Sequence, residues 1–230
     1  MTTIVEAVSY SKTLRRKLAL VSTGSERSFW SHPELRSIYP EYCFLTHCVI
    51  RASAPIMAAA RDRAIELSAN RDNTDPVSAL LVPYLDQHIA EEHEHDDWLL
   101  DDMEVLGLQR EDVLRRIPPA EVAAVVGAQY YWLRHAHPVA VLGYIAVLEG
   151  DPPREEDVEE AIVRTGLPRA AFRTILSHAT LDPGHKEEFE SFLDTLPLTP
   201  EQEALVGLSA IHTAAGIQRV FSLVERNPTL

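Results

Sequence analysis

The segment from His88 to Asp96 reads H-I-A-E-E-H-E-H-D and is dense in metal-binding side chains. Residues three, four and seven apart share one helical face, so His88, Glu92 and His95 are expected to point the same way. A buried carboxylate is costly unless it is paired, and a metal ion is one way to pair it. The stretch therefore indicates half of a metal site, although a solvated, acidic helix face is an alternative. Glu91 lies four residues before His95 and is an alternative to Glu92.

A second group of metal-binding types is His178-x3-Asp182-x2-His185. Its spacings of four and three also allow one helical face, which suits a second half-site. Asp182 precedes Pro183, and an aspartate in that place is typical of a helix N-cap, so it has both a structural and a ligand interpretation. Because proline disfavours helical geometry in the residue before it, we predict a helix break at Asp182 and a locally weak ligand-bearing segment.

A lone carboxylate, Glu149, ends the apolar run from Val139 to Leu148. It follows Ile145 and Leu142 by four and seven residues, which places it on the buried stripe of a helix. The alternative is a frayed helix end at which Glu149 turns to solvent.

Together, the three groups supply three carboxylates and three imidazoles from three separate helices. Such an oxygen and nitrogen set suits iron or manganese better than a thiolate-bound metal. The core of a helical bundle is where carboxylate-bridged sites of this kind are built. The six expected ligands are Glu92, His95, Glu149, His178, Asp182 and His185, with His88 and Glu91 as further candidates.

The elements that must position these side chains all have helical spacing, and we find no alternating strand pattern. Five X-Pro steps look like helix starts, at Pro76, Pro138, Pro168, Pro183 and Pro200. We expect an all-α bundle of about seven to ten helices. The expected segments are Ser31–Ser37, Glu41–Leu67 with a kink at Pro55, Pro76–Leu106, Pro119–Arg134, Pro138–Glu149, Arg154–Thr165, Pro168–Ser177, Pro183–Asp194 and Pro200–Glu225.

Length and composition restrict the classes of protein. A chain of 230 residues with 46% hydrophobic and 24% charged residues is expected to form one globular domain over residues 1–230. A formal net charge of -14 argues against nucleic acid as a partner. We find no apolar run approaching the roughly 18 residues that span a bilayer and no signal-peptide pattern, so we expect a cytoplasmic protein without a membrane partner. Cys43 and Cys48 are expected to be buried free thiols.

These residues resemble the haem-oxygenase-like diiron oxidases, a family also described as iron-containing redox enzymes and similar in fold to TenA thiaminases and pyrroloquinoline-quinone synthase. The resemblance covers most of the chain and depends on E-x-x-H at Glu92 and His95, the isolated Glu149, and the His178, Asp182 and His185 motif. It implies about seven core helices, two iron ions that activate O2, and a third ligand-bearing helix that only metal orders. Some members have an extra glutamate ligand where this chain has His88.

From the resemblance we expect an O2-dependent oxidase or oxygenase of a small carboxylate-bearing substrate, of the amino acid or fatty acid type, with natural-product biosynthesis as one setting for it. Three carboxylates against two ferrous ions leave a formal charge of about +1, which favours an anionic substrate group. Manganese is an alternative to iron, and an external electron donor and a homodimer are both compatible with this hypothesis. Tyr130, Tyr131, Trp132 and Tyr144 are candidates for the pocket wall.

Three other classes of protein remain open at this stage. One is a metal-free, TenA-like hydrolase or small-molecule-binding protein with Cys43 or Cys48 as nucleophile. Another is a haem protein or haem oxygenase with one proximal histidine. The third is a structural or interaction-only protein that binds no metal in any state. We expect no ligand role for six further histidines, which belong to no spaced set: His32, His47, His93, His135, His137 and His212.

Overall fold

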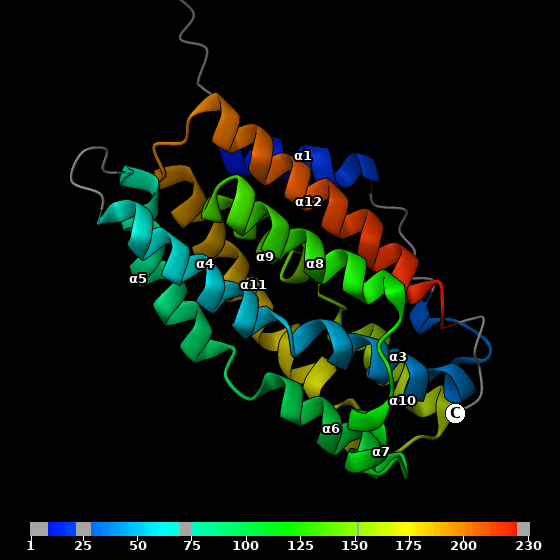
Figure 1. The fold of residues 1–230 in the computed structure, drawn as a ribbon. Helices are drawn as coiled ribbons and strands as arrows, with labels where there is room; N and C mark the ends of the chain where they lie inside the picture. The colour runs from blue at the N-terminus through cyan, green and yellow to red at the C-terminus, as the bar shows by residue number, and fades with distance from the viewer. Residues whose placement is uncertain (1–8, 22–28, 70–74, 151, 225–230) are drawn as a thin grey trace, which may run out of the picture.

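The computed structural model describes residues 9–21, 29–69, 75–150 and 152–224, with the side chains of residues 181–183 excepted. Within these ranges the protein is an all-α bundle without a strand, which confirms the predicted fold class (Figure 1). The helices are α1 (Tyr10–Val21), α3 (Leu35–Ile50), α4 (Ser53–Ser68), α5 (Pro76–Glu91), α6 (His95–Val105), α7 (Arg110–Arg115), α8 (Ala120–His135), η1 (Pro138–Ala140), α9 (Val141–Leu148), α10 (Glu155–Thr165), η2 (Arg169–Phe172), α11 (Arg173–Thr195) and α12 (Pro200–Phe221).

Helix α12 packs along α9 and α8 on one side of the bundle, with α1 beside it, while α4 packs on α5 and α3 on α6 (Figure 1). The approach of α9 to α12 requires a glycine. A Cβ on Gly143 would lie 2.4 Å from the carbonyl oxygen of Val206 and 2.6 Å from the backbone nitrogen of Ala210. Any larger residue would push the two helices apart. This packing fixes the position of α9 and therefore of Glu149, which follows its last residue.

Two of the predicted helix starts show the expected capping chemistry. The Asp75 side chain accepts a hydrogen bond from the Ser78 backbone N–H, with Pro76 as the first helical residue of α5. At the start of α12, Thr199 and Gln202 form a reciprocal capping box. Both arrangements satisfy backbone donors that a helix end leaves unpaired. Helix α12 ends at Phe221 and residues 222–224 form a turn, so the last helix is shorter than the predicted segment, whose final residue Glu225 lies outside the described residues.

The N-terminal helices divide at different places from those predicted. A single helix, α3, begins at Leu35 and continues through Pro40, whereas the sequence suggested one segment ending at Ser37 and another starting at Glu41. The predicted kink at Pro55 is instead a break at residues 51–52. Proline clashes with the carbonyl four residues earlier, here that of Arg51, so one helix ends there and Pro55 falls in the first turn of α4.

The predicted break at Asp182 is wrong. Helix α11 is continuous from Arg173 to Thr195, so Pro168–Ser177 and Pro183–Asp194 do not form separate helices. An internal proline costs about 3 kcal/mol. Ile175 and Leu176 are buried before it and Phe189 and Leu193 after it, and each such side chain contributes about 1.5–3 kcal/mol on burial. Burial on both sides of Pro183 therefore outweighs its local cost.

One helical stretch, residues 35–68, is long and apolar enough by composition to cross a membrane, contrary to the expectation that no apolar run approaches this length. It consists of α3, the turn at residues 51–52 and α4. More than half of its most apolar window is buried against other parts of the chain. That burial is what core helices of a bundle show, so the stretch is weak evidence for a membrane.

Candidate metal centre

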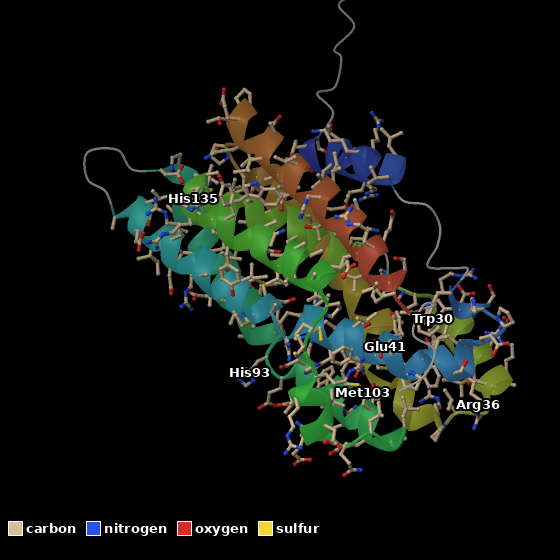
Figure 2. The ribbon with its side chains drawn as sticks, turned by 45° about the vertical axis from the view of Figure 1, so that its right-hand side comes forward. Trp30, Arg36, Glu41, His93, Met103 and His135 are labelled. Carbon is tan, nitrogen blue, oxygen red and sulfur yellow. The ribbon has the colours of Figure 1, made fainter. Side chains whose placement is uncertain are left out.

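The ligand-rich segment is a turn between two helices and not one long helix. Helix α5 ends at Glu91 and α6 begins at His95, so the prediction of a single helix over Pro76–Leu106 is wrong. Glu94 adopts the left-handed conformation, with φ 68° and ψ 5°, and among the described residues it is the non-glycine with positive φ. Figure 2 shows His93, from the same turn, pointing away from the bundle.

The acidic residues after the break favour it. Asp96 and Asp97 lie in the first turn of α6, where the positive end of the helix dipole stabilises them, although Glu91 and Glu92 lie unfavourably at the negative end of α5. A left-handed glutamate costs of order 1–3 kcal/mol. Strain of this kind often marks a functional site, and here the turn brings His95 back toward Glu92.

Three side chains form the first cluster, which we define as Glu92, His95 and His178. One potential ligand atom from each lies within 4.8 Å of the others. His95 Nδ1 is 3.0 Å from Glu92 Oε2, and His178 Nδ1 lies 2.9 Å from the carbonyl oxygen of Thr174. An Nδ1–H that donates to a backbone carbonyl leaves Nε2 free as a metal ligand.

Helix α6 also positions the helix that bears His178. The Asp102 carboxylate is buried and accepts a hydrogen bond of 2.9 Å from the Thr174 backbone N–H, in the first turn of α11. The indole of Trp98 packs on the His95 ring, with 4.2 Å between centroids. One helix thus provides a candidate ligand, a packing partner for it, and an anchor for the opposite helix.

The second cluster, defined as His88, Glu92 and Glu149, shares the Glu92 carboxylate with the first. Its ligand atoms also lie within 4.8 Å of one another, and His88 Nε2 is 2.5 Å from Glu149 Oε1. Glu149 is only 9% exposed, so it is not the solvated, frayed helix end that the sequence left open. The structure therefore brings His88, an uncertain candidate in the sequence, into direct contact with an expected ligand.

His185 lies at the edge of the second cluster, with its ring centroid 6.1 Å from that of His88. The side chain of Asp182, also expected as a ligand, lies outside the described residues. On the same helix, the Lys186 ammonium donates to the carbonyl of Gly150, which ties α11 to the chain just after Glu149. Of the six expected ligands, Glu92, His95, His178 and Glu149 belong to the clusters, and His185 lies beside the second one.

Two buried atoms of the candidate ligands, Glu149 Oε2 and His185 Nδ1, have no hydrogen-bond partner among the described residues. Unpaired buried acceptors are costly and rare in folded proteins, and an unrecorded ion is one standard explanation. Carboxylate oxygens and imidazole nitrogens without a thiolate are the donors that iron and manganese use. The residues present therefore fit a carboxylate-bound transition metal.

Electrostatics in the clusters follow from burial and mutual contact. Burial would raise the pKa of the Glu92 carboxyl, but the hydrogen bond with His95 and the nearby His178 and His88 lower it below its ordinary value. Burial lowers the pKa of His178, which favours the neutral imidazole that binds metals. Burial would also lower the pKa of His88, yet the contact with Glu149 raises it overall.

The structure distinguishes the roles of the neighbouring residues Glu91 and Glu92, which the sequence alone could not do. Glu92 belongs to both clusters, and its side chain is 12% exposed. The Glu91 side chain is 33% exposed, accepts a hydrogen bond from Gln87, and lies 3.6 Å from His88 Nδ1. Glu91 therefore flanks the centre, and Glu92 is the shared carboxylate.

A cavity of about 410 Å³ opens beside the clusters, and His88, Glu92, Glu149 and His178 are part of its wall. Most of the aromatic residues that were predicted from the sequence to line the pocket are not among its described wall residues. Tyr130 and Tyr131 are 40% and 63% exposed, Trp132 is absent from the described wall, and only Tyr144 of the four lines it. The aromatic wall consists instead of Phe29, Trp30, Tyr42 and Phe221.

These aromatic residues were missed because they come from distant segments, although their contacts are close. Phe29 stacks on Tyr42 with ring centroids 4.4 Å apart, and Tyr42 stacks on Phe221 at 5.0 Å. No spacing rule joins residues before α3 to the end of α12. A sequence signal exists only for Tyr42, Thr46 and Ile50, which follow one another at intervals of four on α3.

Both cysteines are fully enclosed by the core, as predicted. Cys43 is 0% and Cys48 2% exposed, and burial raises the pKa of each thiol. Neither lines the cavity in the described part of the chain. Since the thiolate is the nucleophilic form, both are poorly suited to nucleophilic catalysis.

Comparison with known proteins agrees with the fold and the chemistry of the donor set. The model of a family described as iron-containing redox enzymes matches residues 78–215, which include every expected ligand. No curated protein sequence matches the chain.

The solved structures with a similar fold include the following two. A domain of unknown function with a heme oxygenase-like fold from Shewanella denitrificans OS217 has a TM-score of 0.78 at 19% identity, covering 96% of this chain and 94% of that one. A TenA homolog from Pseudomonas syringae pv. tomato str. DC3000 has a TM-score of 0.70 at 13% identity, covering 95% of this chain and 93% of that one. At these identities the likeness establishes a haem-oxygenase-like fold and nothing further.

Proposed function

Since the chain belongs to the family of iron-containing redox enzymes, we propose that it is a non-haem diiron oxidase or oxygenase that uses O2 on a small carboxylate-bearing substrate. The single observation that best supports two ions is the Glu92 carboxylate, which belongs to both ligand clusters. A carboxylate has two oxygens and can bridge two cations. One ion alone would leave the second cluster without a function.

In this proposal, His95 and His178 complete the first ion's protein ligands, and Glu149 and His185 contribute to the second. Asp182, which is three residues before His185, and His88 are further ligand candidates for the second ion. Bound iron would supply O2 activation. Manganese is the alternative metal, because the same donors suit it.

The protein's own residues have two tasks around such a centre. Thr174 and Trp98 fix the orientation of the His178 and His95 rings, through a hydrogen bond and through ring packing respectively. The apolar cavity wall excludes water from the space where substrate and O2 would meet. A dry, shaped cavity strengthens electrostatic interactions and limits side reactions.

The rival function is a metal-free, TenA-like hydrolase or binding protein, which the fold alone would permit. The hydrolase requires a reactive thiol, and both thiols are buried away from the cavity with raised pKa values. A metal-free protein of either kind also leaves Glu149 Oε2 and His185 Nδ1 as unexplained buried polar atoms.

The deciding experiment is an anaerobic Fe(II) titration of chelator-treated protein, followed by exposure to O2 with visible absorption recorded. We expect two irons per chain and a transient absorption band, with the band lost in His178→Ala. His93→Ala is the matched control, because His93 lies in the same segment but its side chain is 73% exposed. Absence of stoichiometric binding in the wild type would refute the proposal and favour the metal-free rival. A Soret band on adding haem would instead indicate a haem protein.

A further inference from the structure

Two neighbouring helices of the bundle, α8 and α12, have central segments without charge. Residues 122–133 of α8 and 204–218 of α12 contain no aspartate, glutamate, lysine or arginine. At the chain's average of 24% charged residues, these 27 positions would include about six. Depletion of charged residues is typical of the core of a protein–protein interface, but also of buried helices, so exposure decides between the two.

Part of both segments is exposed to solvent. We define the uncharged face by five exposed residues, Ala124 and Tyr131 of α8 and Ala204, Leu208 and Ile211 of α12. The exposed fractions of Tyr131, Leu208 and Ile211 are 63%, 53% and 37%. Single exposed apolar side chains are ordinary, whereas several of them on adjacent helices mark an interaction surface.

Buried contacts hold α8 and α12 side by side behind this face (Figure 1). Gln129 Nε2 donates to the Thr213 hydroxyl, and the Ser209 hydroxyl donates to Gln129 Oε1, each at 3.1 Å. All three of these residues are fully buried. The ring centroids of Trp132 and His212 are 5.3 Å apart. The uncharged face is therefore one surface built on two helices that are fixed to each other.

The uncharged face is bounded on α12 by one charge of each sign. Glu201 lies in the first turn of this helix and Arg219 in the last, and both are exposed. The 18 residues that separate them make five turns of 3.6 residues, so both side chains leave the helix in the same direction. Leu208, seven residues after Glu201, lies on the same side. Neither charge has an ion-pair partner among the described residues.

A second copy of this chain is complementary to such a face. In a two-fold contact, the same surface of both copies meets itself. Glu201 and Arg219 are each nine residues from Ala210, so two antiparallel α12 helices with the axis beside Ala210 bring Glu201 of each copy to the partner's Arg219. Leu208 and Ile211 then lie beside the axis, where they are covered by the other copy. A parallel arrangement would instead bring like charges together.

We propose that the uncharged face is the interface of a two-fold symmetric homodimer, in which α12 packs antiparallel on α12 of a second copy and Glu201 pairs with the partner's Arg219 at each end. Net charge favours this face, because two copies with a formal charge of -14 each repel one another least where neutral surfaces meet. The inference does not depend on the proposed diiron function. It gives the partner a supporting role for the cavity, since α12 contributes Ile217 and Phe221 to the cavity wall.

The first test is sedimentation equilibrium of the full chain over a range of concentrations. We expect wild type to have twice the mass of one 25.7 kDa chain. Leu208→Asp should raise the Kd of the dimer at least about 100-fold, because a carboxylate buried in an apolar interface without a partner loses its solvation. Leu208 is about half exposed in the single chain, so this variant should fold, which circular dichroism checks.

The matched control is Leu114→Asp. Leu114 is on α7, which packs on α6, and its exposed fraction of 49% is close to the 53% of Leu208. This control should remain dimeric. A wild type that is monomeric at about 100 μM would overturn the proposal. So would a Leu208→Asp variant that dimerises as tightly as Leu114→Asp, since the interface would then lie on another face.

The second test reverses the charges at the two ends of α12. Glu201→Arg and Arg219→Glu each bring like charges together at both ends of the dimer, so each variant alone should dimerise about tenfold more weakly than wild type. In an equal mixture of the two variants, each end again joins one acid and one base. The mixture should therefore form heterodimers with a Kd near that of wild type. Mixing cannot repair a folding defect, so a mixture that dimerises no better than either variant alone would refute the antiparallel arrangement.

Discussion

The first and second clusters share the Glu92 carboxylate but are built differently. In the first, His178 is oriented by a backbone carbonyl and His95 by Trp98 packing, and Asp102 links the two helices that contribute them. In the second, His88 and Glu149 contact each other directly, and Glu149 Oε2 remains unpaired. Each cluster would have to exchange an internal histidine–glutamate contact for a metal ion, but in the first a backbone hydrogen bond from outside the cluster also orients His178, so the first is the better preorganised. We expect the first to bind its ion more tightly.

The largest effect should come from removing the residue that both clusters share. Glu92→Gln is expected to abolish stoichiometric binding of both ions and reduce turnover at least about 100-fold, since loss of mere outer contacts to metal ligands already costs 10–100-fold. The iron content of the variant after Fe(II) loading tests the loss of binding. Glu91→Gln, one residue away and partly exposed, should retain two ions. Loss of metal in Glu91→Gln with retention in Glu92→Gln would reverse our assignment.

The next largest effect should come from variants that each remove a candidate ligand of one ion only. His178→Ala should lose the tighter of the two ions and His185→Ala the weaker, because the first residue belongs to the better preorganised cluster and the second lies beside the other. Stepwise Fe(II) titration of each variant distinguishes these losses. Equal loss of both ions in both variants would mean that the clusters bind metal as one cooperative unit.

A smaller effect concerns the pH dependence of the metal-free protein. Contact with Glu149 raises the folded-state pKa of His88 above its unfolded value, so the stabilisation it provides is present below the unfolded pKa and is lost as pH rises through the folded one. Urea denaturation should show His88→Ala costing more at about pH 6 than at about pH 9. A cost that is the same at both values would show that packing, and not charge, holds this pair.

The smallest effect should come from the strained turn beside the first cluster. Glycine adopts positive φ without penalty, so Glu94→Gly should raise the free energy of unfolding by about 0.5–1 kcal/mol. Thermal or urea denaturation measures this change in the free energy of unfolding. Glu94→Ala keeps the strain and should give no such gain. If both variants stabilise equally, the relevant factor is the negative charge of Glu94 and not its backbone.

Some of the candidate centre was readable in the sequence because helical spacing is a local property. Intervals of three, four and seven residues singled out His88, Glu92 and His95, and Glu149 followed from its place on an apolar stripe. For His95 the residue was named by a rule that does not hold there, because the turn between α5 and α6, and not helical spacing, brings it to Glu92. The caps at Asp75 and Thr199 were also predictable, since an N-cap depends on a few adjacent residues.

Other features depended on contacts between distant segments. Nothing local decides that Glu92 rather than Glu91 faces both clusters, that α11 stays intact across Pro183, or that Phe221 meets Tyr42 in the cavity wall. Each is settled by burial against other helices, which can outweigh a propensity of a few kcal/mol. The sequence by itself thus determined which side chains could bind metal. Only the tertiary structure decided which carboxylate is shared and what kind of cavity lies beside it, because both result from packing between helices far apart in the chain.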